Sequence, residues 1–370
     1  MKILTAILAA VIAVSCLNFT AYAVPSDNIS AESAIVMNAD TGGVLYEKNA
    51  YRQRAMASTT KIMTALITLE SGDLDRPFTV DSMAVRVEGT SMGLREGDTV
   101  TRRALCYGML LPSGNDAANA AAVNIAGSLS AFAELMNKRA ARIGMNDTHF
   151  VNPSGLDAEG HYTTAYDMAL LTREALKNDE FRAICGMKSA QVEFGAPPHK
   201  RTLYNSNKLL RLYDCCIGVK TGFTDNARRC LVSAAERDGC TVIAVTLNAP
   251  DDWNDHKKLL DDGFSKIRPV NVRINSFAAE VVGGCSDTVT IVPEHAVTLG
   301  MTEAESRTVS VKYSSPGFVY AEIEKGDMLG YADIYLGEAF IEKIPLVAAE
   351  SVARVIPELT LWKRIMHFFS

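Results

Sequence analysis

The sequence has little that would hold a metal ion. It contains no Cys-x-x-Cys pair and no His-Glu-x-x-His motif, and its six histidines do not cluster at the spacings of metal ligands. These histidines are His149, His161, His199, His256, His295 and His367. We therefore expect no metal site, and no pattern in the chain points to a cofactor.

The chain has few prolines and fewer basic residues than acidic ones. The chain of 370 residues has 12 prolines, and 37 Lys and Arg face 43 Asp and Glu, which gives a formal net charge of −6. This balance argues against a protein that grips nucleic acid through a basic face. The apolar fraction of 48% instead allows a large buried core, and the length favours two or three domains.

The N-terminus has the pattern of an export signal. Lys2 precedes an apolar run over residues 3–14, and Ala21-Tyr22-Ala23 offers a small-residue cleavage site. We predict residues 1–23 as a cleaved signal peptide. A retained anchor is a poorer explanation, because Asn18 and Thr20 interrupt the run of about 20 apolar residues that crossing needs. The mature chain would keep seven cysteines, an odd number, so at least one thiol is free.

Strand and helix patterns are mixed over residues 24–268. Two short strands around the turn at Gly42 and Gly43 predict a hairpin over residues 33–37 and 44–46. Apolar residues at three- and four-residue spacing, or runs of alanine, predict helices over 58–69, 115–125 and 168–176. Further strands are predicted over 215–219, 229–235 and 241–247. The mixture indicates an α/β (α+β) domain with antiparallel strands.

The composition changes near Pro269. Residues 270–348 are rich in valine, isoleucine and threonine, contain turn signals and lack helical periodicity, so we predict a small all-β domain. Residues 350–370 are predicted as an amphipathic helix, with Pro357 in its first turn. Its apolar face would hold Val352, Val355, Ile356, Leu359, Trp362, Met366 and Phe369. A helix docked on the protein's own surface is the alternative to the membrane anchor that the aromatic residues and adjacent cations favour.

Three short motifs in the first domain carry the chemistry. Ser58-Thr59-Thr60-Lys61 fits Ser-x-x-Lys, Ser113-Gly114-Asn115 fits Ser-x-Asn, and Lys220-Thr221-Gly222 fits Lys-Thr-Gly. Each alone has little specificity, but the three occur in this order and in fitting contexts. Two other matches are set aside. Gly89-Thr90-Ser91-Met92-Gly93 is not followed by the helix that a nucleophile elbow requires, and Ser26-Asp27-Asn28 lies next to the predicted cleavage site.

The motif spacing indicates acyl transfer by a serine. On a helix, residues three apart share a face, so the Lys61 amine is predicted to reach the Ser58 hydroxyl. Lys61 can accept the proton only if burial or a second cation such as Lys220 lowers its pKa. The predicted catalytic residues are therefore Ser58, Lys61, Ser113 and Asn115, and the predicted substrate-binding residues are Lys220, Thr221, Gly222 and Phe223. Helix capping is the alternative role for Ser113 and Asn115.

These motifs and their surroundings resemble the serine D-alanyl-D-alanine carboxypeptidase family of low-molecular-mass penicillin-binding proteins. The likeness covers almost the whole mature chain and includes Gly89-Thr90-Ser91-Met92, the segments 111–118 and 150–156, and residues 218–224. It implies a transpeptidase-like, β-lactamase-like domain with an antiparallel sheet flanked by helices, a β-rich C-terminal domain and a terminal amphipathic helix on the outer face of the cytoplasmic membrane.

The resemblance also implies a reaction. Ser58 would attack the carbonyl between the last two D-alanines of a peptidoglycan stem pentapeptide, and water would then resolve the acyl-enzyme. β-Lactam antibiotics would acylate the same serine, with no cofactor. One departure stands out, because the family often has another glycine shortly after the third motif, where this chain has Asn226-Ala227-Arg228-Arg229. His161, Tyr162 and Asp167 are assigned to the scaffold.

Two other functions remain open at this stage. A serine β-lactamase shares the three motifs but deacylates through a glutamate-activated water, and Glu159 lacks the expected spacing to an asparagine. A wall-binding protein that keeps the fold without turnover is less favoured, since all three motifs are intact. Rapid hydrolysis of penicillin would favour the first of these, and an absence of D-alanine release would favour the second.

Overall fold

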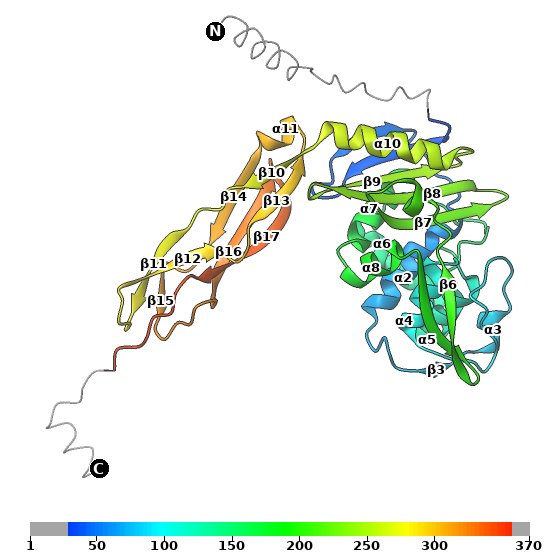
Figure 1. The fold of residues 1–370 in the computed structure, drawn as a ribbon, viewed down its shortest axis with the longest axis horizontal. Helices are drawn as coiled ribbons and strands as arrows, with labels where there is room; N and C mark the ends of the chain where they lie inside the picture. The colour runs from blue at the N-terminus through cyan, green and yellow to red at the C-terminus, as the bar shows by residue number, and fades with distance from the viewer. Residues whose placement is uncertain (1–28, 357–370) are drawn as a thin grey trace, which may run out of the picture. The chain divides into compact units, whose positions relative to one another are not determined.

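The computed structural model describes residues 29–356. Two compact units follow one another in the chain, and the division falls between Ile267 and Arg268 (Figure 1). The first unit combines helices with strands, and the second is built mainly of strands. The predicted signal peptide, Ser26-Asp27-Asn28 and residues 357–370 lie outside the described residues.

An antiparallel five-stranded sheet with the order β2-β1-β9-β8-β7 runs through the first unit. Its strands are β1 (Ser33–Asn38), β2 (Val44–Lys48), β7 (Cys216–Thr224), β8 (Arg228–Arg237) and β9 (Cys240–Leu247). The predicted hairpin is confirmed as β1 and β2, and all three later strands are present. β7 continues to Thr224 instead of ending at Val219, which places Lys220-Thr221-Gly222 within an edge strand.

Helices cover both faces of this sheet. On one face α10 packs on β1, β8 and β9, and on the other face a cluster that includes α2, α7 and α8 packs on the strands (Figure 1). The helices of this unit are α2 (Lys61–Glu70), α3 (Ser82–Val85), α4 (Arg102–Leu110), α5 (Asn115–Ala126), α6 (Leu129–Ile143), α7 (Ala165–Ala175), α8 (Asp179–Gly186), α9 (Leu209–Leu212) and α10 (Asp252–Lys266). The α/β architecture with an antiparallel sheet flanked by helices is therefore confirmed.

The helix that carries the first motif begins with a tighter turn than predicted. Residues Ala57–Thr60 form a 3₁₀ turn, η2, and α2 follows from Lys61. The predicted buried face is correct, because Ile62, Leu66 and Leu69 are all buried. Burial of these apolar side chains fixes the helix against α4 and α5, and so fixes the position of Ser58 at its start.

A second, smaller sheet in the first unit was not predicted. It has the order β3-β4-β5-β6, with β3 (Phe78–Thr79), β4 (Thr99–Val100), β5 (Ser189–Gly195) and β6 (Pro198–Tyr204). β5 and β6 form a hairpin in continuous register. β5 does alternate, since Val192 and Phe194 are buried and Gln191 and Glu193 are exposed, but β6 has Leu203 as its one buried residue and so lacks the alternation that marks a half-buried strand.

The second unit is a β domain with its own apolar core. Its larger sheet has the order β14-β16-β17-β12-β11-β15, and β10 pairs with β13. Its elements are β10 (Arg268–Val272), β11 (Phe277–Val282), β12 (Thr288–Pro293), β13 (Val297–Met301), α11 (Glu303–Ser306), β14 (Val309–Ser314), β15 (Phe318–Tyr320), β16 (Met328–Leu336) and β17 (Ala339–Ala348). The β-rich character predicted for residues 270–348 is confirmed.

The start of the predicted terminal helix is wrong. Residues 350–356 are extended chain, in which Val352 pairs with Ile323 and Arg354 pairs with Gly284. Val352 is buried in the core of the β domain, so its apolar character reflects sheet packing and not a helical face. Within residues 29–356, no helix combines the length and apolar character that crossing a bilayer requires.

Candidate active site

The three motifs meet at one cleft of about 530 Å³ in the first unit. Ser58 comes from η2, Ser113 from the loop before α5, Asn115 from the first residue of α5, and the Thr221–Gly222 pair from the edge strand β7. The lining residues are Ser58, Gly89, Thr90, Pro112, Ser113, Asn115, Gly155, Leu156, Ser206, Lys208, Thr221, Gly222, Phe223, Thr224, Arg229, Asp252 and Trp253. Segments far apart in the chain are therefore brought to one place.

Lys61 lies at the centre of the polar network. Its amine donates to the Ser58 hydroxyl at 2.8 Å, to Asn115 Oδ1 at 2.6 Å and to the Ser154 carbonyl at 2.5 Å. The side chain is fully buried. Burial lowers the pKa of Lys61 well below its usual value, and the nearby Lys220 ammonium lowers it further, while Asp116 acts in the opposite direction. An amine in this setting favours the neutral form that accepts a proton.

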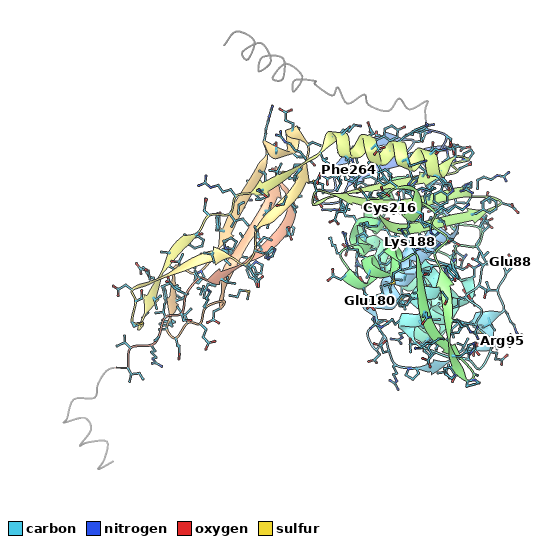
Figure 2. All side chains as sticks on the ribbon, viewed as in Figure 1. Glu88, Arg95, Glu180, Lys188, Cys216 and Phe264 are labelled. Atoms are coloured by element: carbon cyan, nitrogen blue, oxygen red, sulfur yellow. The ribbon has the colours of Figure 1, made fainter. Side chains whose placement is uncertain are left out.

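The second motif contributes one side chain to Lys61 and one to the cleft. Asn115 is held in place because its Nδ2 donates to the Glu88 carbonyl at 2.7 Å (Glu88 is labelled in Figure 2). Ser113 takes a positive φ of 69°. The N-cap position of α5 is Gly114, without a side-chain cap, so capping does not occupy the Ser113 hydroxyl. Ser113 therefore does not cap α5, contrary to the alternative considered from the sequence. The Asn115 side chain contacts Lys61 and does not cap the helix either.

The third motif supplies a buried cation and a close approach of strands. Lys220 is 1% exposed, its amine donates to the Thr221 carbonyl at 3.0 Å, and burial lowers its pKa to about 7. Thr221 Oγ1 lies 3.2 Å from Ser206 Oγ. A Cβ at Gly222 would come within 3.1 Å of the Ser58 nitrogen and 3.2 Å of the Met56 carbonyl. Glycine therefore allows β7 to lie directly against η2.

A turn that was not predicted as part of the site completes the surroundings of Lys61. Asn152 Oδ1 accepts from the Ser154 and Gly155 amides, at 3.2 and 2.8 Å, and this fixes the Ser154 carbonyl that faces Lys61. Gly155 has a φ of +86°, and a Cβ there would lie 2.0 Å from the Ala57 carbonyl. The Asn-Pro-Ser-Gly sequence is a turn signal, but a backbone acceptor leaves no trace in residue type.

Two further buried polar groups hold the motif segments. Asp116 accepts from the Met92, Gly93 and Leu94 amides and from the Ser91 hydroxyl, which donates at 2.6 Å. His161 bonds through Nε2 to Thr60 Oγ1 at 2.9 Å, and burial lowers its pKa to about 4. His161 is thus neutral at physiological pH and braces η2. The scaffold role predicted for His161 agrees with these contacts.

The residues set aside in the sequence have structural explanations. The Ser91 hydroxyl donates a hydrogen bond to the Asp116 carboxylate. Residues 86–98 are irregular, so no helix begins directly after Gly93, as predicted. Glu159 is exposed and forms none of the contacts around Ser58 and Lys61 described above. Among residues 29–356, no group of three or more His, Cys, Asp or Glu side chains is placed to hold a metal ion.

All seven cysteines of the described chain are free thiols. Cys106, Cys185, Cys230 and Cys240 are buried, Cys285 is exposed, and Cys216 lies at the start of β7 (Figure 2). Burial raises the pKa of Cys185 to about 12. The buried thiols therefore act as small apolar side chains, which agrees with the role expected for most of the cysteines.

Comparison with known proteins identifies both units. The family model described as D-alanyl-D-alanine carboxypeptidase matches residues 20–251, and the one described as penicillin-binding protein 5, C-terminal domain, matches residues 275–354. The D-alanyl-D-alanine carboxypeptidase DacF of Bacillus subtilis is 32% identical, over 91% of this chain and 89% of that protein. DacC of Escherichia coli is 30% identical, over 89% of this chain and 86% of that protein.

Solved structures agree with these relatives. The D-alanyl-D-alanine carboxypeptidase DacD of Francisella tularensis is 28% identical with a TM-score of 0.63, over 91% of this chain and 96% of that chain. The DD-transpeptidase of Streptomyces K15 is 34% identical with a TM-score of 0.62, over 65% of this chain and all of that one. This chain therefore belongs to the serine D-alanyl-D-alanine carboxypeptidase family, the low-molecular-mass penicillin-binding proteins.

Proposed function

We propose that this protein removes the terminal D-alanine from peptidoglycan stem pentapeptides through an acyl-enzyme on Ser58. The observation that carries the proposal is the 2.8 Å contact between the buried Lys61 amine and the Ser58 hydroxyl at the wall of an open cleft. A hydroxyl becomes a nucleophile when a base takes its proton, and a neutral buried lysine is such a base.

Acylation begins at the Ser58 hydroxyl. Its oxygen attacks the carbonyl carbon between the last two D-alanines, and its proton passes to Lys61. The negative charge then forms on the former carbonyl oxygen. The backbone amides of Ser58 and Phe223 would stabilise that oxygen, and the close packing of Gly222 on the Ser58 nitrogen supports their convergence.

Collapse of this intermediate breaks the peptide bond. The leaving nitrogen takes a proton that Ser113 relays from Lys61, and free D-alanine departs. Water then attacks the ester, with Lys61 again accepting a proton, and Ser58 is regenerated. Asn115 keeps Lys61 in position through its 2.6 Å contact, and Asn115 also lines the cleft where the acyl chain would lie.

The terminal carboxylate of the substrate has a matching site. Lys220 supplies positive charge behind β7, and Thr221 supplies a hydroxyl at the cleft wall. Lys220 also lowers the pKa of Lys61, so one cation serves both substrate binding and activation of the base. This arrangement favours peptides that end in a free carboxylate.

Mass spectrometry with penicillin tests the assignment of Ser58. β-Lactams present a strained amide to the same serine, and we expect one drug mass to be added to the protein and no addition to Ser58→Ala. Labelling of the alanine variant would show that the serine is wrongly assigned. Release of D-alanine from a pentapeptide separates an enzyme from a drug binder, and a long-lived penicillin adduct separates it from a β-lactamase.

We also propose that the protein is exported and bound to the outer face of the cytoplasmic membrane. Residues 1–23 would direct export. Trp362, Phe368 and Phe369, with Lys363 and Arg364 beside them, give the last residues the composition of an interfacial anchor. Sedimentation with lipid vesicles, with and without residues 357–370, tests the membrane contact.

A further inference from the structure

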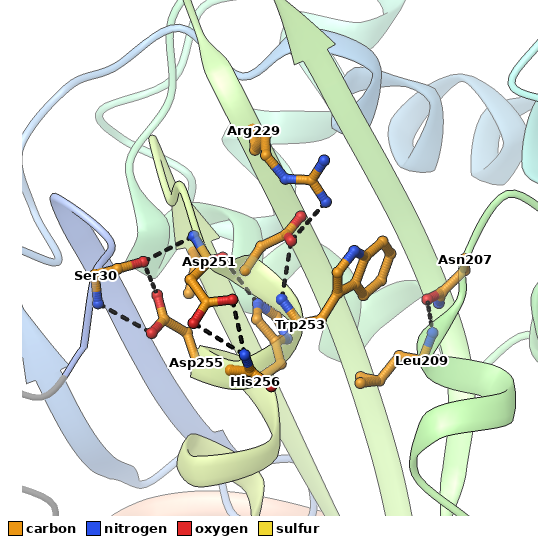
Figure 3. A network of polar contacts seen from close by, with 11 residues as sticks. Ser30, Asn207, Leu209, Arg229, Asp251, Trp253, Asp255 and His256 are labelled. Carbon is orange, nitrogen blue, oxygen red and sulfur yellow. Dashed lines mark hydrogen bonds and ion pairs between the residues drawn. The ribbon is translucent and has the colours of Figure 1, made fainter.

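The two ends of the described chain are held in different ways. At the N-terminal end, Ser30 donates its backbone amide and its hydroxyl to the Asp255 carboxylate of α10, at 3.0 and 2.7 Å (Figure 3). At the C-terminal end, the Val355 amide donates to the Gly283 carbonyl at 2.8 Å, so the backbone is fixed there as well. Val355 and Ile356 are nevertheless 52% and 82% exposed. The chain therefore leaves the β domain with apolar side chains uncovered.

Three more exposed apolar side chains adjoin this point. Val282 of β11 directly precedes Gly283 and pairs with Tyr320 of the parallel strand β15. Val281 is buried on the inner face of the sheet, so Val282, Tyr320 and Phe318 share the outer face. The rings of Phe318 and Tyr320 pack edge to face, with centroids 5.5 Å apart. We call the residues Val282, Phe318, Tyr320, Val355 and Ile356 the β15 patch.

The β15 patch is small and lies at one end of the β domain. β11 and β15 are at the end of the domain away from α11 (Figure 1). β15 is an edge strand of three residues, too short a row of free backbone groups to hold an added peptide strand. A specific dimer interface uses about 20–30 residues on each side. A compact group of aromatic and aliphatic side chains instead suits the boundary between the head groups and acyl chains of a bilayer.

The chain connectivity brings this patch close to the proposed membrane anchor. Trp362 follows Ile356 by six residues, so their backbones are at most about 22 Å apart in any conformation. A bilayer that binds the aromatic residues of the terminal segment is therefore within short reach of Ile356. Two contacts on one chain reinforce each other, because the second forms within the reach of the first.

The charges beside the patch indicate what kind of contact it makes. Glu280 pairs with Phe318 across β11 and β15, and Glu322 follows Tyr320 by two residues. Anionic lipids repel these carboxylates. Binding of the patch to a bilayer would therefore gain from burial of apolar surface and not from charge, and it should depend little on salt.

We propose that the β15 patch is a second membrane contact, which docks on the head-group region of a lipid bilayer beside the terminal segment. This inference rests on the proposed membrane binding of residues 357–370 and adds a site within the folded β domain. The patch strengthens attachment without being sufficient for it, because only five side chains take part. A chain cut after Ile356 is therefore still expected to stay in solution.

Sedimentation of the full mature chain with vesicles tests the proposal. The vesicles contain equal parts of phosphatidylcholine and phosphatidylglycerol. In Phe318→Ser with Tyr320→Ser we expect the partition coefficient to fall about tenfold, the factor that corresponds to roughly 60 Å² of apolar surface left uncovered. The fall should be the same at low and at high salt, since it reflects apolar burial.

Tyr335→Ser with Phe340→Ser is the matched control. These two rings also pack edge to face, with centroids 5.8 Å apart, and Phe340 is exposed like Phe318. They flank the β16–β17 turn, whose Gly337 amide donates to the carbonyl of Thr308, two residues after α11. This pair is thus at the other end of the domain, and its loss should leave the partition coefficient unchanged.

A fluorophore on Cys285 gives a second measurement, which carries the test if the Phe318 and Tyr320 variant does not fold. Cys285 is exposed, and its amide donates to the Ala353 carbonyl at 2.8 Å, next to the patch. Nitroxide-labelled head groups should quench this fluorophore. They should not quench one on Glu338→Cys in a Cys285→Ser background, and Cys285→Ser alone corrects for labelling of other thiols.

The outcomes separate the inference from the proposal beneath it. Equal pelleting of wild type and the Phe318 and Tyr320 variant, or an unquenched Cys285 fluorophore on bound protein, would overturn the inference. So would a variant that loses self-association but not pelleting, because the patch would then receive a second copy of the chain. A wild type that does not pellet at all would instead overturn the proposed anchor in residues 357–370.

Discussion

Lys61 combines two properties that rarely occur together in a lysine. It is fully buried, and the partners of its amine described above are neutral oxygens, from Ser58, Asn115 and Ser154. Hydrogen-bond acceptors position the amine, while burial and Lys220 disfavour its charge. The identity of residue 115 is therefore important, because an amide leaves the charge of Lys61 unsupported and a carboxylate would support it.

Asn115→Asp should shift the pH dependence of acylation. A carboxylate in place of the amide oxygen 2.6 Å from the amine would raise the pKa of Lys61, because it stabilises the ammonium. Lys61 then stays protonated to higher pH, so the acid limb of the penicillin acylation rate moves to higher pH and the rate at pH 7 falls. Stopped-flow acylation across pH measures this limb.

Asn124→Asp provides the comparison on the same helix. It adds the same charge at a site where Asn124 already accepts from Arg102 at 2.8 Å, far along α5 from Lys61. Its acid limb should coincide with that of wild type. If Asn115→Asp also left the limb in place, Lys61 would not be the group whose protonation limits acylation.

At the scale of elements, the site depends on how closely two segments approach η2. β7 reaches it through Gly222, and the turn at residues 152–155 reaches it through Gly155. Both contacts involve the backbone that carries Ser58. The position of the nucleophile is therefore set by backbone packing of three elements and not by its own side chain alone.

Gly155→Ala and Gly160→Ala separate this packing from local strain. Both glycines have positive φ, 86° and 80°, so alanine costs about 1–2 kcal/mol of folding free energy at either position. Only at Gly155 would the new Cβ lie 2.0 Å from the Ala57 carbonyl; at Gly160 the nearest atom is 3.8 Å away. We expect Gly160→Ala to acylate normally, and Gly155→Ala to lose further stability and to acylate more slowly. Thermal unfolding and penicillin labelling measure the two effects, and equal behaviour would contradict the packing argument.

The contact between Ser58 and Lys61 and the buried face of their helix could be predicted from the sequence, because both follow from helical spacing. The i, i+3 spacing of Ser58 and Lys61 fixes their contact, and the periodicity of residues 62–69 fixes the buried face behind them. The Ser154 carbonyl and the anchoring of Arg229 by Asp252 could not be predicted. A backbone acceptor has no residue signature, and an ion pair across 23 positions depends on the sheet register.

At the scale of the whole molecule, the described residues form separate apolar cores in the two units. The core residues around the site come from the first unit, and those of the β domain lie between Ala279 and Val352. The β core takes in Val352 because the chain there adds to the sheet. An apolar residue such as Val352 has the same appearance in the sequence whether it packs on strands or on a helical face, which explains why residues 350–356 were wrongly predicted as helical.

Cutting the chain after Ile356 should separate catalysis from membrane binding. The described cores are complete by Val352, so the shortened protein should unfold at the same temperature as the full chain and take up penicillin at the same rate. It should no longer pellet with anionic lipid vesicles, since the removed residues hold the aromatic side chains and cations that suit an interface.

In the full chain, Lys363→Gln with Arg364→Gln should weaken pelleting mainly at low salt, because screening already removes the ionic contribution at high salt. Replacing Trp362, Phe368 and Phe369 by serine should weaken it at all salt concentrations. Undiminished pelleting of the shortened protein would place the membrane contact elsewhere in the chain.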